Sequence, residues 1–261
     1  MQNNKLILNM KSVFLCLLCL LFLVGCVTER TSGREKTIDL QKSFDLHVQI
    51  ALGYIQKGNR ESARHHLKKA FDINANSPVA TSAMAQLYEL EGEPALAEES
   101  FKLALKRDKN FTEAHNNYGI FLFNLKRYEE AYAEFEKAAA DLAFPGRSQA
   151  LTNVGRVALK LGNTIRAKAA FEHATILDRS AAEPYIELGD INFQQQDYAE
   201  AKKCLDLYAR LGQQSARSLL LGIRLERIFG NKDKEASLAI LLKNAFPYSK
   251  EYLEYKQNNI N

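Results

Sequence analysis

The sequence predicts an all-α protein in which about six helical hairpins stack into a solenoid behind a short apolar leader. Three observations predict this fold class. A pattern of small and bulky apolar residues recurs about every thirty-four residues, a turn signal divides each copy, and an unbroken apolar run occupies residues 13–24. The repeating pattern accounts for residues 38–250, and we expect a continuous apolar core along that stretch.

The recurring pattern is an alanine, an apolar residue four positions later, and a second small or apolar residue three positions after that. Four copies are clear and a fifth is weaker: Ala63/Leu67/Ala70, Ala97/Phe101/Ala104, Ala131/Phe135/Ala138, Ala167/Phe171/Ala174 and Ala201/Leu205/Tyr208. A period of about thirty-four residues is that of tetratricopeptide repeats, so the chain resembles an array of such repeats.

A second signature with a small residue at its centre precedes each copy of this three-residue pattern. The small residues are Ala51, Ala85, Gly119, Gly155 and Gly189. We expect each copy to form two helices, because a small residue on the first helix lets the second helix approach closely. The bulky residue of the three-residue pattern then fills the space between them. The residues of this pattern are therefore predicted to be packing residues and not part of a chemical site.

Turn signals mark the point where each hairpin reverses. Gly58, Gly92 and Gly162 supply the positive φ that ends a helix. In the third and fifth copies Lys126-Arg127 and Gln196-Asp197 take that place. Loops of two to four residues make neighbouring helices antiparallel, so every copy is predicted to be a hairpin.

The array is predicted to end with a degenerate sixth pair of helices. Leu221-Gly222 repeats the first-helix signature, and Ala236 opens a second helix. Terminal repeats are expected to be atypical because one face meets water. The chain leaves the array at Pro247, and residues 251–261 are predicted to form a polar C-terminal tail.

The N-terminal leader predicts export. Lys5 and Lys11 precede the apolar run at residues 13–24, which is too short to span a membrane and is typical of a secretory signal. The run ends in Leu23-Val24-Gly25-Cys26, which resembles the lipobox of bacterial lipoproteins. The alternative is an ordinary cleavage site with an unrelated cysteine, although such sites usually have the Ala-x-Ala pattern.

The lipobox resemblance implies a division of the first 37 residues. Residues 1–25 would be the lipoprotein signal peptide, and residues 26–37 the acylated N-terminus and a flexible tether. Cys26 would receive the diacylglyceryl group and a further acyl chain on its new α-amine. Val27 follows it in place of the aspartate that usually retains lipoproteins in the inner membrane. The resemblance therefore implies a lipid anchor in the outer membrane, on its periplasmic face, in a Gram-negative bacterium.

Composition argues against several classes of function. The formal net charge is +4, and without the two lysines of the leader it would be near +2, so nothing predicts a nucleic-acid partner. Of four cysteines, Cys16 and Cys19 lie in the leader and Cys26 in the lipobox. The remaining one, Cys204, is predicted to be a small buried residue, with a reactive thiol as the alternative.

Catalytic and metal-binding patterns are also missing from the sequence. The five histidines are scattered, and the adjacent pair His65-His66 would point to different faces of a helix and could not share a metal. No nucleophile elbow, phosphate-binding loop or zinc-protease motif is present. Glutamates such as Glu98 and Glu129 stand among lysines and arginines on predicted outer faces. The sequence thus predicts a protein that is not an enzyme, with no cofactor, no metal and no small-molecule substrate.

Function is expected in the groove that the first helices of such an array line. The predicted partner-binding groove consists of Leu52, Ile55, Val79, Gln86, Leu90, Asn116, Ile120, Phe123, Asn124, Arg156 and Leu159. Val48, Thr152, Ile186 and Phe193 occupy corresponding positions and are expected to face the groove too. Apolar residues from three successive repeats would form one patch rimmed by Asn and Gln, which is typical of a partner site. Ordinary surface with scattered apolar residues is the alternative.

One stretch makes the resemblance more specific. Ala114-His115-Asn116-Asn117-Tyr118-Gly119-Ile120-Phe121-Leu122, the long junction around Pro145, and the closing Phe246-Pro247-x-Ser249-x-Glu251-Tyr252 resemble the PilF/PilW family of type IV pilus biogenesis lipoproteins. Together with the lipobox the resemblance covers nearly the whole chain. The chain departs from the repeat consensus at His47 and His115, which stand where a tryptophan is usual.

The resemblance implies a pilotin, an outer-membrane lipoprotein that binds the type IV pilus secretin. Such a protein supports the localisation and multimerisation of the secretin in the outer membrane, and hence pilus biogenesis. A second hypothesis is an outer-membrane scaffold that recruits peptidoglycan-remodelling enzymes, which would need the same lipid anchor and groove. A catalytic lipoprotein is a third, and the sequence offers no site for it.

Overall fold

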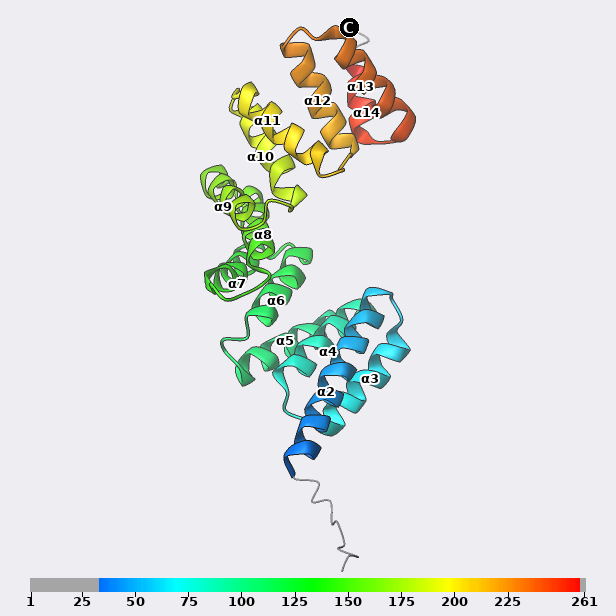
Figure 1. Cartoon of the computed structure of the whole chain (residues 1–261), viewed down its shortest axis with the longest axis vertical. Helices are drawn as coiled ribbons and strands as arrows, with labels where there is room; N and C mark the ends of the chain where they lie inside the picture. The colour runs from blue at the N-terminus through cyan, green and yellow to red at the C-terminus, as the bar shows by residue number, and fades with distance from the viewer. Residues whose placement is uncertain (1–32, 259–261) are drawn as a thin grey trace, which may run out of the picture. The chain divides into compact units, whose positions relative to one another are not determined.

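A computed structural model describes residues 33–258, and within that range every regular element is an α-helix (Figure 1). The helices are α2 (Gly33–Gln56), α3 (Arg60–Ile73), α4 (Pro78–Glu91), α5 (Pro94–Arg107), α6 (Thr112–Asn124), α7 (Tyr128–Ala140), α8 (Arg147–Lys160), α9 (Thr164–Leu177), α10 (Ala182–Gln194), α11 (Tyr198–Arg210), α12 (Ala216–Ile228), α13 (Lys232–Ala245) and α14 (Lys250–Gln257). None of these helices is long and apolar enough to cross a membrane.

The chain divides into two compact units, residues 1–46 and 47–261. The described part of the first unit is the N-terminal portion of α2. The predicted signal peptide and Cys26 lie outside the described residues, as does most of the predicted tether. The last five residues of that tether, 33–37, belong to α2, because the segment has no proline and its Arg, Glu and Lys residues favour a helix.

In the second unit the helices pair as hairpins in chain order. The pairs are α4/α5, α6/α7, α8/α9, α10/α11 and α12/α13. They are preceded by the C-terminal part of α2, which packs against α3 through Ala51, Ala63 and Leu67. Two or three residues separate the helices of each pair, which makes them antiparallel neighbours. The predicted all-α solenoid of about six tetratricopeptide hairpins is confirmed.

The residues of the three-residue pattern occupy the interfaces within the hairpins. The three members of each of its first four copies are at most 1% exposed, and in the fifth copy Leu205 and Tyr208 are 8% and 9% exposed. A Cβ atom on Gly119 would lie 2.7 Å from the ring of Phe135, and one on Gly155 would lie 2.6 Å from the ring of Phe171. Glycine is therefore required where the large ring of the second helix rests on the first, as predicted.

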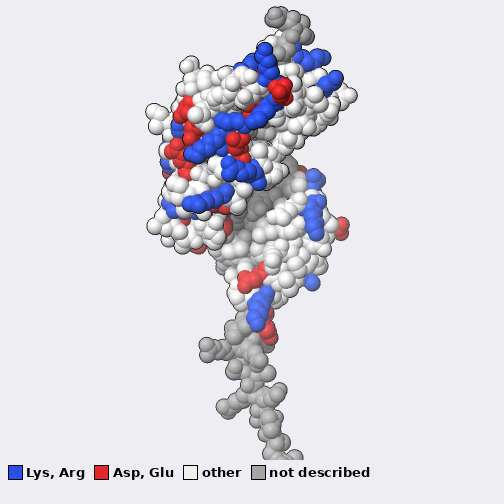
Figure 2. Space-filling view, turned by 45° about the horizontal axis from the view of Figure 1, so that its top comes forward, with Lys and Arg blue, Asp and Glu red and all other residues white. Residues whose placement is uncertain are grey.

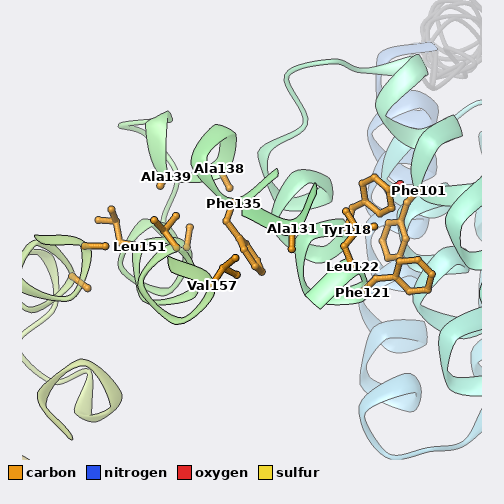
Figure 3. Close-up of a cluster of buried hydrophobic side chains, with 14 of the residues drawn as sticks. Phe101, Tyr118, Phe121, Leu122, Ala131, Phe135, Ala138, Ala139, Leu151 and Val157 are labelled. Atoms are coloured by element: carbon orange, nitrogen blue, oxygen red, sulfur yellow. The ribbon is translucent and has the colours of Figure 1, made fainter. Parts of the chain in front are cut away.

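Side chains from consecutive hairpins share one apolar core. Figure 3 shows Phe101, Tyr118 and Phe121 grouped together, and their ring centroids lie 5.5 to 6.1 Å apart. The same cluster continues through Phe135 to Val157 of α8. Burial of this kind stabilises a protein by about 25 cal/mol for each Å² of apolar surface removed from water. The core thus joins each hairpin to the next and fixes the surfaces that remain for binding.

The turns within the hairpins lie where the sequence predicts them, and two of them have a residue other than glycine at the left-handed position. Gly58, Gly92 and Gly162 have φ values of 72°, 80° and 77°. In the third and fifth hairpins Lys126 and Gln196 adopt the same left-handed conformation, with φ of 61° and 62°. A side chain in this region costs about 1 kcal/mol relative to glycine.

The C-terminal segment differs from the prediction of a polar tail over residues 251–261. Residues 250–257 form α14, whose first turn is capped by the Ser249 hydroxyl, which accepts a hydrogen bond from the Tyr252 amide at 3.1 Å. Tyr252 and Tyr255, three positions apart, lie on one helical face. They pack against the buried cluster that includes Leu220. The array therefore ends in a helix that covers the last hairpin.

Candidate functional site

The predicted groove residues lie on the first helices α2, α4, α6 and α8, and their exposure varies. Val79 and Ile120 are each 38% exposed, and Asn124 is exposed. The others are half-buried: Leu52, Ile55, Gln86, Leu90, Asn116, Phe123, Arg156 and Leu159. Leu52, Ile55 and Leu90 pack against a buried cluster around Leu67 and Leu87. These three therefore form the edge of the core, with only part of each side chain open to a partner.

Three further positions that the sequence placed in the groove are buried. Val48, Thr152 and Ile186 are 5%, 2% and 5% exposed. Ile186 belongs to a core cluster with Leu221 of the following hairpin, and Phe193 is partly buried against the same cluster. A first-helix position is accessible only where the next hairpin leaves it uncovered, and helical register alone does not give that information.

Three predicted groove residues come together in one cleft. Phe123 of α6, Arg156 and Leu159 of α8, and with them Lys160 and Glu187 of α10, line a cleft of about 260 Å³, called here the groove cleft. All of its residues come from the first helices of three successive hairpins. The structure thus forms a recess where the sequence predicted a binding surface, and adds Lys160 and Glu187 to it.

A cation–π contact organises the groove cleft. The Arg156 guanidinium lies 5.1 Å from the centroid of the Phe123 ring, and its Nε is 3.3 Å from Glu183 Oε1. The Phe123 ring also packs against Tyr128, with centroids 5.5 Å apart. Arg156 therefore covers part of the aromatic surface, and a ligand at this cleft would contact Arg156 as well as Phe123.

Asparagines beside the groove cleft connect neighbouring hairpins. Asn124 Nδ2 donates a hydrogen bond to Glu89 Oε1 at 3.0 Å, and Asn153 Nδ2 donates to Asn116 Oδ1 at 3.2 Å. These bonds fix the orientation of the amides, since an amide that donates to one neighbour presents its carbonyl in a defined direction. Asn116 and Asn124 are thus held in place before any partner arrives.

A second cleft on the first-helix face was missed by sequence reasoning. Helices α10, α12 and α14 line a volume of about 310 Å³ with Asp190, Gln194, Arg217, Leu220, Leu221, Arg224, Lys250, Glu251 and Glu254. On the face that Figure 2 presents, basic and acidic side chains are interleaved over the upper part of the molecule. One signal in the sequence could have indicated this cleft. Glu187 and Asp190 stand three positions apart on the first helix of one hairpin, α10, and Arg217 stands on the first helix of the next hairpin, α12.

Arg217 is the centre of this charged network. Its Nη1 and Nη2 each donate to Glu187 at 2.8 Å, and its Nε donates to Asp190. The bidentate bonds to Glu187 raise the pKa of Arg217 above its usual value. Burial raises the pKa of Asp190 despite the adjacent guanidinium. The acids thus already satisfy the arginine, and the network holds α10 to α12.

Residues with possible reactive chemistry are engaged in packing or local hydrogen bonds. Cys204 is 5% exposed, as predicted for a small buried residue, and burial raises the pKa of its thiol to about 11. His47 Nδ1 and His66 Nδ1 lie 3.0 Å apart. No group of three or more His, Cys, Asp or Glu within residues 33–258 is arranged to hold a metal ion.

Comparison with protein families and curated proteins identifies relatives. Two family models, both described as tetratricopeptide repeat, match the chain: one matches residues 82–146 and 154–216, and the other matches residues 44–77. A curated relative from Pseudomonas aeruginosa, type IV pilus assembly protein PilF, is 39% identical over 238 residues, covering 90% of this chain and 93% of the relative. An uncharacterised protein of Haemophilus influenzae is 30% identical over 114 residues, 44% of this chain and 62% of the relative.

Solved structures give the same result. The structure of PilF from Pseudomonas aeruginosa superposes with a TM-score of 0.80 at 38% identity, covering 85% of this chain and 100% of that one. PilW, described as a widely conserved type IV pilus biogenesis factor, superposes with a TM-score of 0.69 at 26% identity, covering 81% and 97%. The repeats, the fold and the extent of these matches show that the chain belongs to the PilF/PilW type of tetratricopeptide-repeat proteins.

Proposed function

We propose that this protein is a pilotin, a lipid-anchored protein of the outer membrane that binds the type IV pilus secretin in the periplasm. In this role it supports outer-membrane localisation and multimerisation of the secretin, and so pilus biogenesis. The observation that carries the proposal is the 39% identity with a type IV pilus assembly protein over 90% of this chain. The match extends over 93% of the relative as well, so the similarity is that of two whole chains and not of a shared repeat alone.

The groove cleft supports a peptide-binding role. It combines an aromatic ring, an aliphatic side chain and a cation, and Asn124 lies in the same helix as Phe123. An extended segment of a partner would place an apolar side chain against Phe123 and Leu159 and a carbonyl or carboxylate beside Arg156. Such a cleft needs no catalytic group, consistent with the non-enzymatic role proposed.

The lipid anchor is proposed at Cys26. Each buried methylene contributes about 0.8 kcal/mol, and a single acyl chain gives only marginal binding, whereas several chains give stable attachment. We expect Cys26→Ala to yield a protein that is unprocessed or absent from outer-membrane fractions. Fractionation with metabolic labelling by a palmitate analogue measures this directly. A Cys26→Ala protein that is processed and remains fully in the outer membrane would refute the lipoprotein assignment.

The groove is tested by charge substitutions at accessible positions. Ile120 is 38% exposed on α6, so Ile120→Glu changes the groove surface with little effect on stability. Arg156→Glu reverses the charge that covers Phe123. Ile165→Glu is the matched control, because it makes the same chemical change outside the groove. Ile165 lies on the second helix α9 and is 85% exposed.

Three readouts belong to this experiment: the thermal stability of the purified proteins, heat-resistant secretin multimers in the outer membrane, and surface pili. We expect Ile120→Glu and Arg156→Glu to reduce multimers and pili, with a loss of binding of about 2 kcal/mol if either residue is central to the contact. Ile165→Glu should behave as the unaltered protein. If the groove variants are stable and lipidated and still give normal secretin multimers, the groove is not the secretin site. If pili are normal but the recruitment of peptidoglycan-remodelling enzymes is altered, the result favours the second hypothesis, an outer-membrane scaffold for those enzymes.

A further inference from the structure

We propose that the protein has a second docking site, a cleft on its second-helix face that binds an acidic segment of a protein partner. The cleft lies between α5 and α7 with α6 as its floor and has a volume of about 560 Å³. Its lining defines what is called here the lysine-rimmed cleft: Lys102, Leu105, Lys106, Lys109, Tyr118, Leu122, Glu130, Ala133 and Glu134. The groove cleft, by contrast, is built only from first helices, so the two sites are distinct.

The floor of the lysine-rimmed cleft is apolar. Tyr118 and Leu122, four positions apart on α6, are 6% and 1% exposed, and Leu105 packs against the same core cluster. Ala133 of α7 is exposed at the other wall and leaves room above the floor because its side chain is small. A recess of several hundred Å³ with an apolar floor accommodates one or two large side chains of a ligand.

The carboxylates of the rim are already neutralised. Glu130 pairs with Arg127 at 2.6 Å, and Glu134 pairs with Lys137 at 2.8 Å. The ammonium groups of Lys106 and Lys109, in contrast, form no ion pair with any carboxylate of residues 33–258. The cleft therefore presents uncompensated positive charge beside an apolar floor, which is complementary to a segment that carries both carboxylates and an apolar side chain.

His115 holds the two walls of the cleft in a fixed relation. Its Nε2 is 3.0 Å from the Lys109 carbonyl oxygen on one wall, and its Nδ1 is 2.5 Å from Glu134 Oε2 on the other. Burial raises the pKa of Glu134, but the hydrogen bonds from His115 and Lys137 outweigh it, so the pKa lies below its usual value and the carboxylate stays charged. A cleft that is rigid beforehand loses little conformational entropy when a ligand binds.

The recess favours a peptide over a membrane surface as the occupant. A flat bilayer of anionic lipids would reach the lysine tips but leave the floor of Tyr118 and Leu122 unfilled. An acidic peptide with a Leu, Phe or Tyr between its carboxylates would fill the floor and pair with Lys106 and Lys109 at the same time. The two kinds of partner therefore differ in whether the floor contributes to binding.

The test begins with a random peptide display library selected on the processed full-length protein in detergent micelles. We expect the selected peptides to carry acidic residues on both sides of an apolar one. Fluorescence anisotropy then measures the binding of a selected peptide to variants. Replacing both lysines, by Lys106→Glu with Lys109→Glu, should weaken binding by about tenfold or more, and Ala133→Glu should do the same by placing a carboxylate over the floor.

Lys160→Glu is the matched control, because it reverses a lysine of the groove cleft and should change the affinity less than about twofold. The double variant Lys106→Gln with Lys109→Gln removes both charges without reversing them. Thermal melts of the variants show that a loss of peptide binding does not come from misfolding. Selected peptides that lack acidic residues, or that bind the double-glutamate variant as tightly, would overturn the proposal. Lysine-dependent flotation with phosphatidylglycerol vesicles without peptide enrichment would also overturn it, in favour of a membrane surface. Arg156→Glu should lose secretin assembly but keep peptide binding, so the two proposals fail separately.

Discussion

Glu98 is held by three side chains from three helices or turns. Its carboxylate pairs with Arg127 at 2.7 Å and with Lys102 at 2.6 Å, and it accepts a hydrogen bond from the Tyr118 hydroxyl at 3.1 Å. Hydrogen bonds from Arg127 and then Lys102 lower the pKa of Glu98 to about 2. One carboxylate thus links the second hairpin to the turn and first helix of the third.

Because of this network, the free energy of unfolding is expected to depend on pH in the acidic range. A carboxyl group whose folded pKa is depressed contributes stability that is present above its unfolded pKa and is lost as the pH falls through the folded value. For Glu98 the window runs from about pH 4.5 to about pH 2. We expect Glu98→Gln to lower the free energy of unfolding at pH 6, and the difference from the unaltered protein to shrink below pH 4.5. Urea unfolding at several pH values measures it, and a difference that is constant from pH 6 to pH 2.5 would contradict this assignment.

The left-handed turn residues give a second prediction at this scale. Gln196 has a φ of 62° in a turn where other hairpins use glycine. Gln196→Gly should raise the free energy of unfolding by about 0.5–1 kcal/mol, because glycine adopts this conformation without strain. The reverse change, Gly162→Ala at a φ of 77°, should lower it although no atom lies within 4 Å of the added Cβ. Urea unfolding of both variants checks the prediction, and a Gln196→Gly variant that is less stable, or a Gly162→Ala variant that is more stable, than the unaltered protein would contradict it.

At the scale of helices, the closeness of two elements depends on single glycines. A Cβ atom at Gly155 would lie 2.6 Å from the Phe171 ring, whereas one at Gly53, also within a helix, would meet nothing within 4 Å. We expect Gly155→Ala to lower the free energy of unfolding by about 1–3 kcal/mol because it forces α8 and α9 apart. Gly53→Ala should raise it by about 0.5–1 kcal/mol through helix propensity. Thermal or urea unfolding measures both variants. Equal effects of Gly155→Ala and Gly53→Ala on the free energy of unfolding would show that the close contact of α8 with α9 does not require glycine at position 155.

At the scale of the whole array, stability is shared between neighbours. The helices of the second unit contact mainly those one or two places away in the chain, as expected for a solenoid. Ala131 is completely buried in α7, so Ala131→Leu should overpack that interface by about 1–3 kcal/mol. We expect hydrogen exchange to increase first in α6, α7 and α8 and least in α13.

The matched control is Ala133→Leu, two positions further along α7, where the side chain is exposed and an added isobutyl group has space. Hydrogen exchange read by mass spectrometry should leave this variant close to the unaltered protein. If Ala131→Leu instead raised exchange equally in all helices, the array would unfold as one cooperative body and the nearest-neighbour description would fail.

The sequence by itself determined the repeat and the contacts within each hairpin. Ala97, Phe101 and Ala104 are all completely buried, as their spacing predicts, and Gly119 meets the Phe135 ring as the small residue of its hairpin. These contacts are local and recur with the period of the repeat, so a pattern along the chain is sufficient to identify them. The groove residues Phe123, Arg156 and Leu159 follow from the same period and do meet in one cleft.

Only the tertiary structure decided which surfaces stay open. Val48, Thr152 and Ile186 share the register of the groove but are buried, and α14 packs through Tyr252 where composition indicated a polar tail. The lysine-rimmed cleft depends on Lys106 being unpaired while the nearby acids find other partners, some about thirty residues away in sequence. Exposure and ion pairing are set by how successive hairpins are placed against one another. That placement results from the sum of many small packing contacts, and no single periodic pattern encodes it.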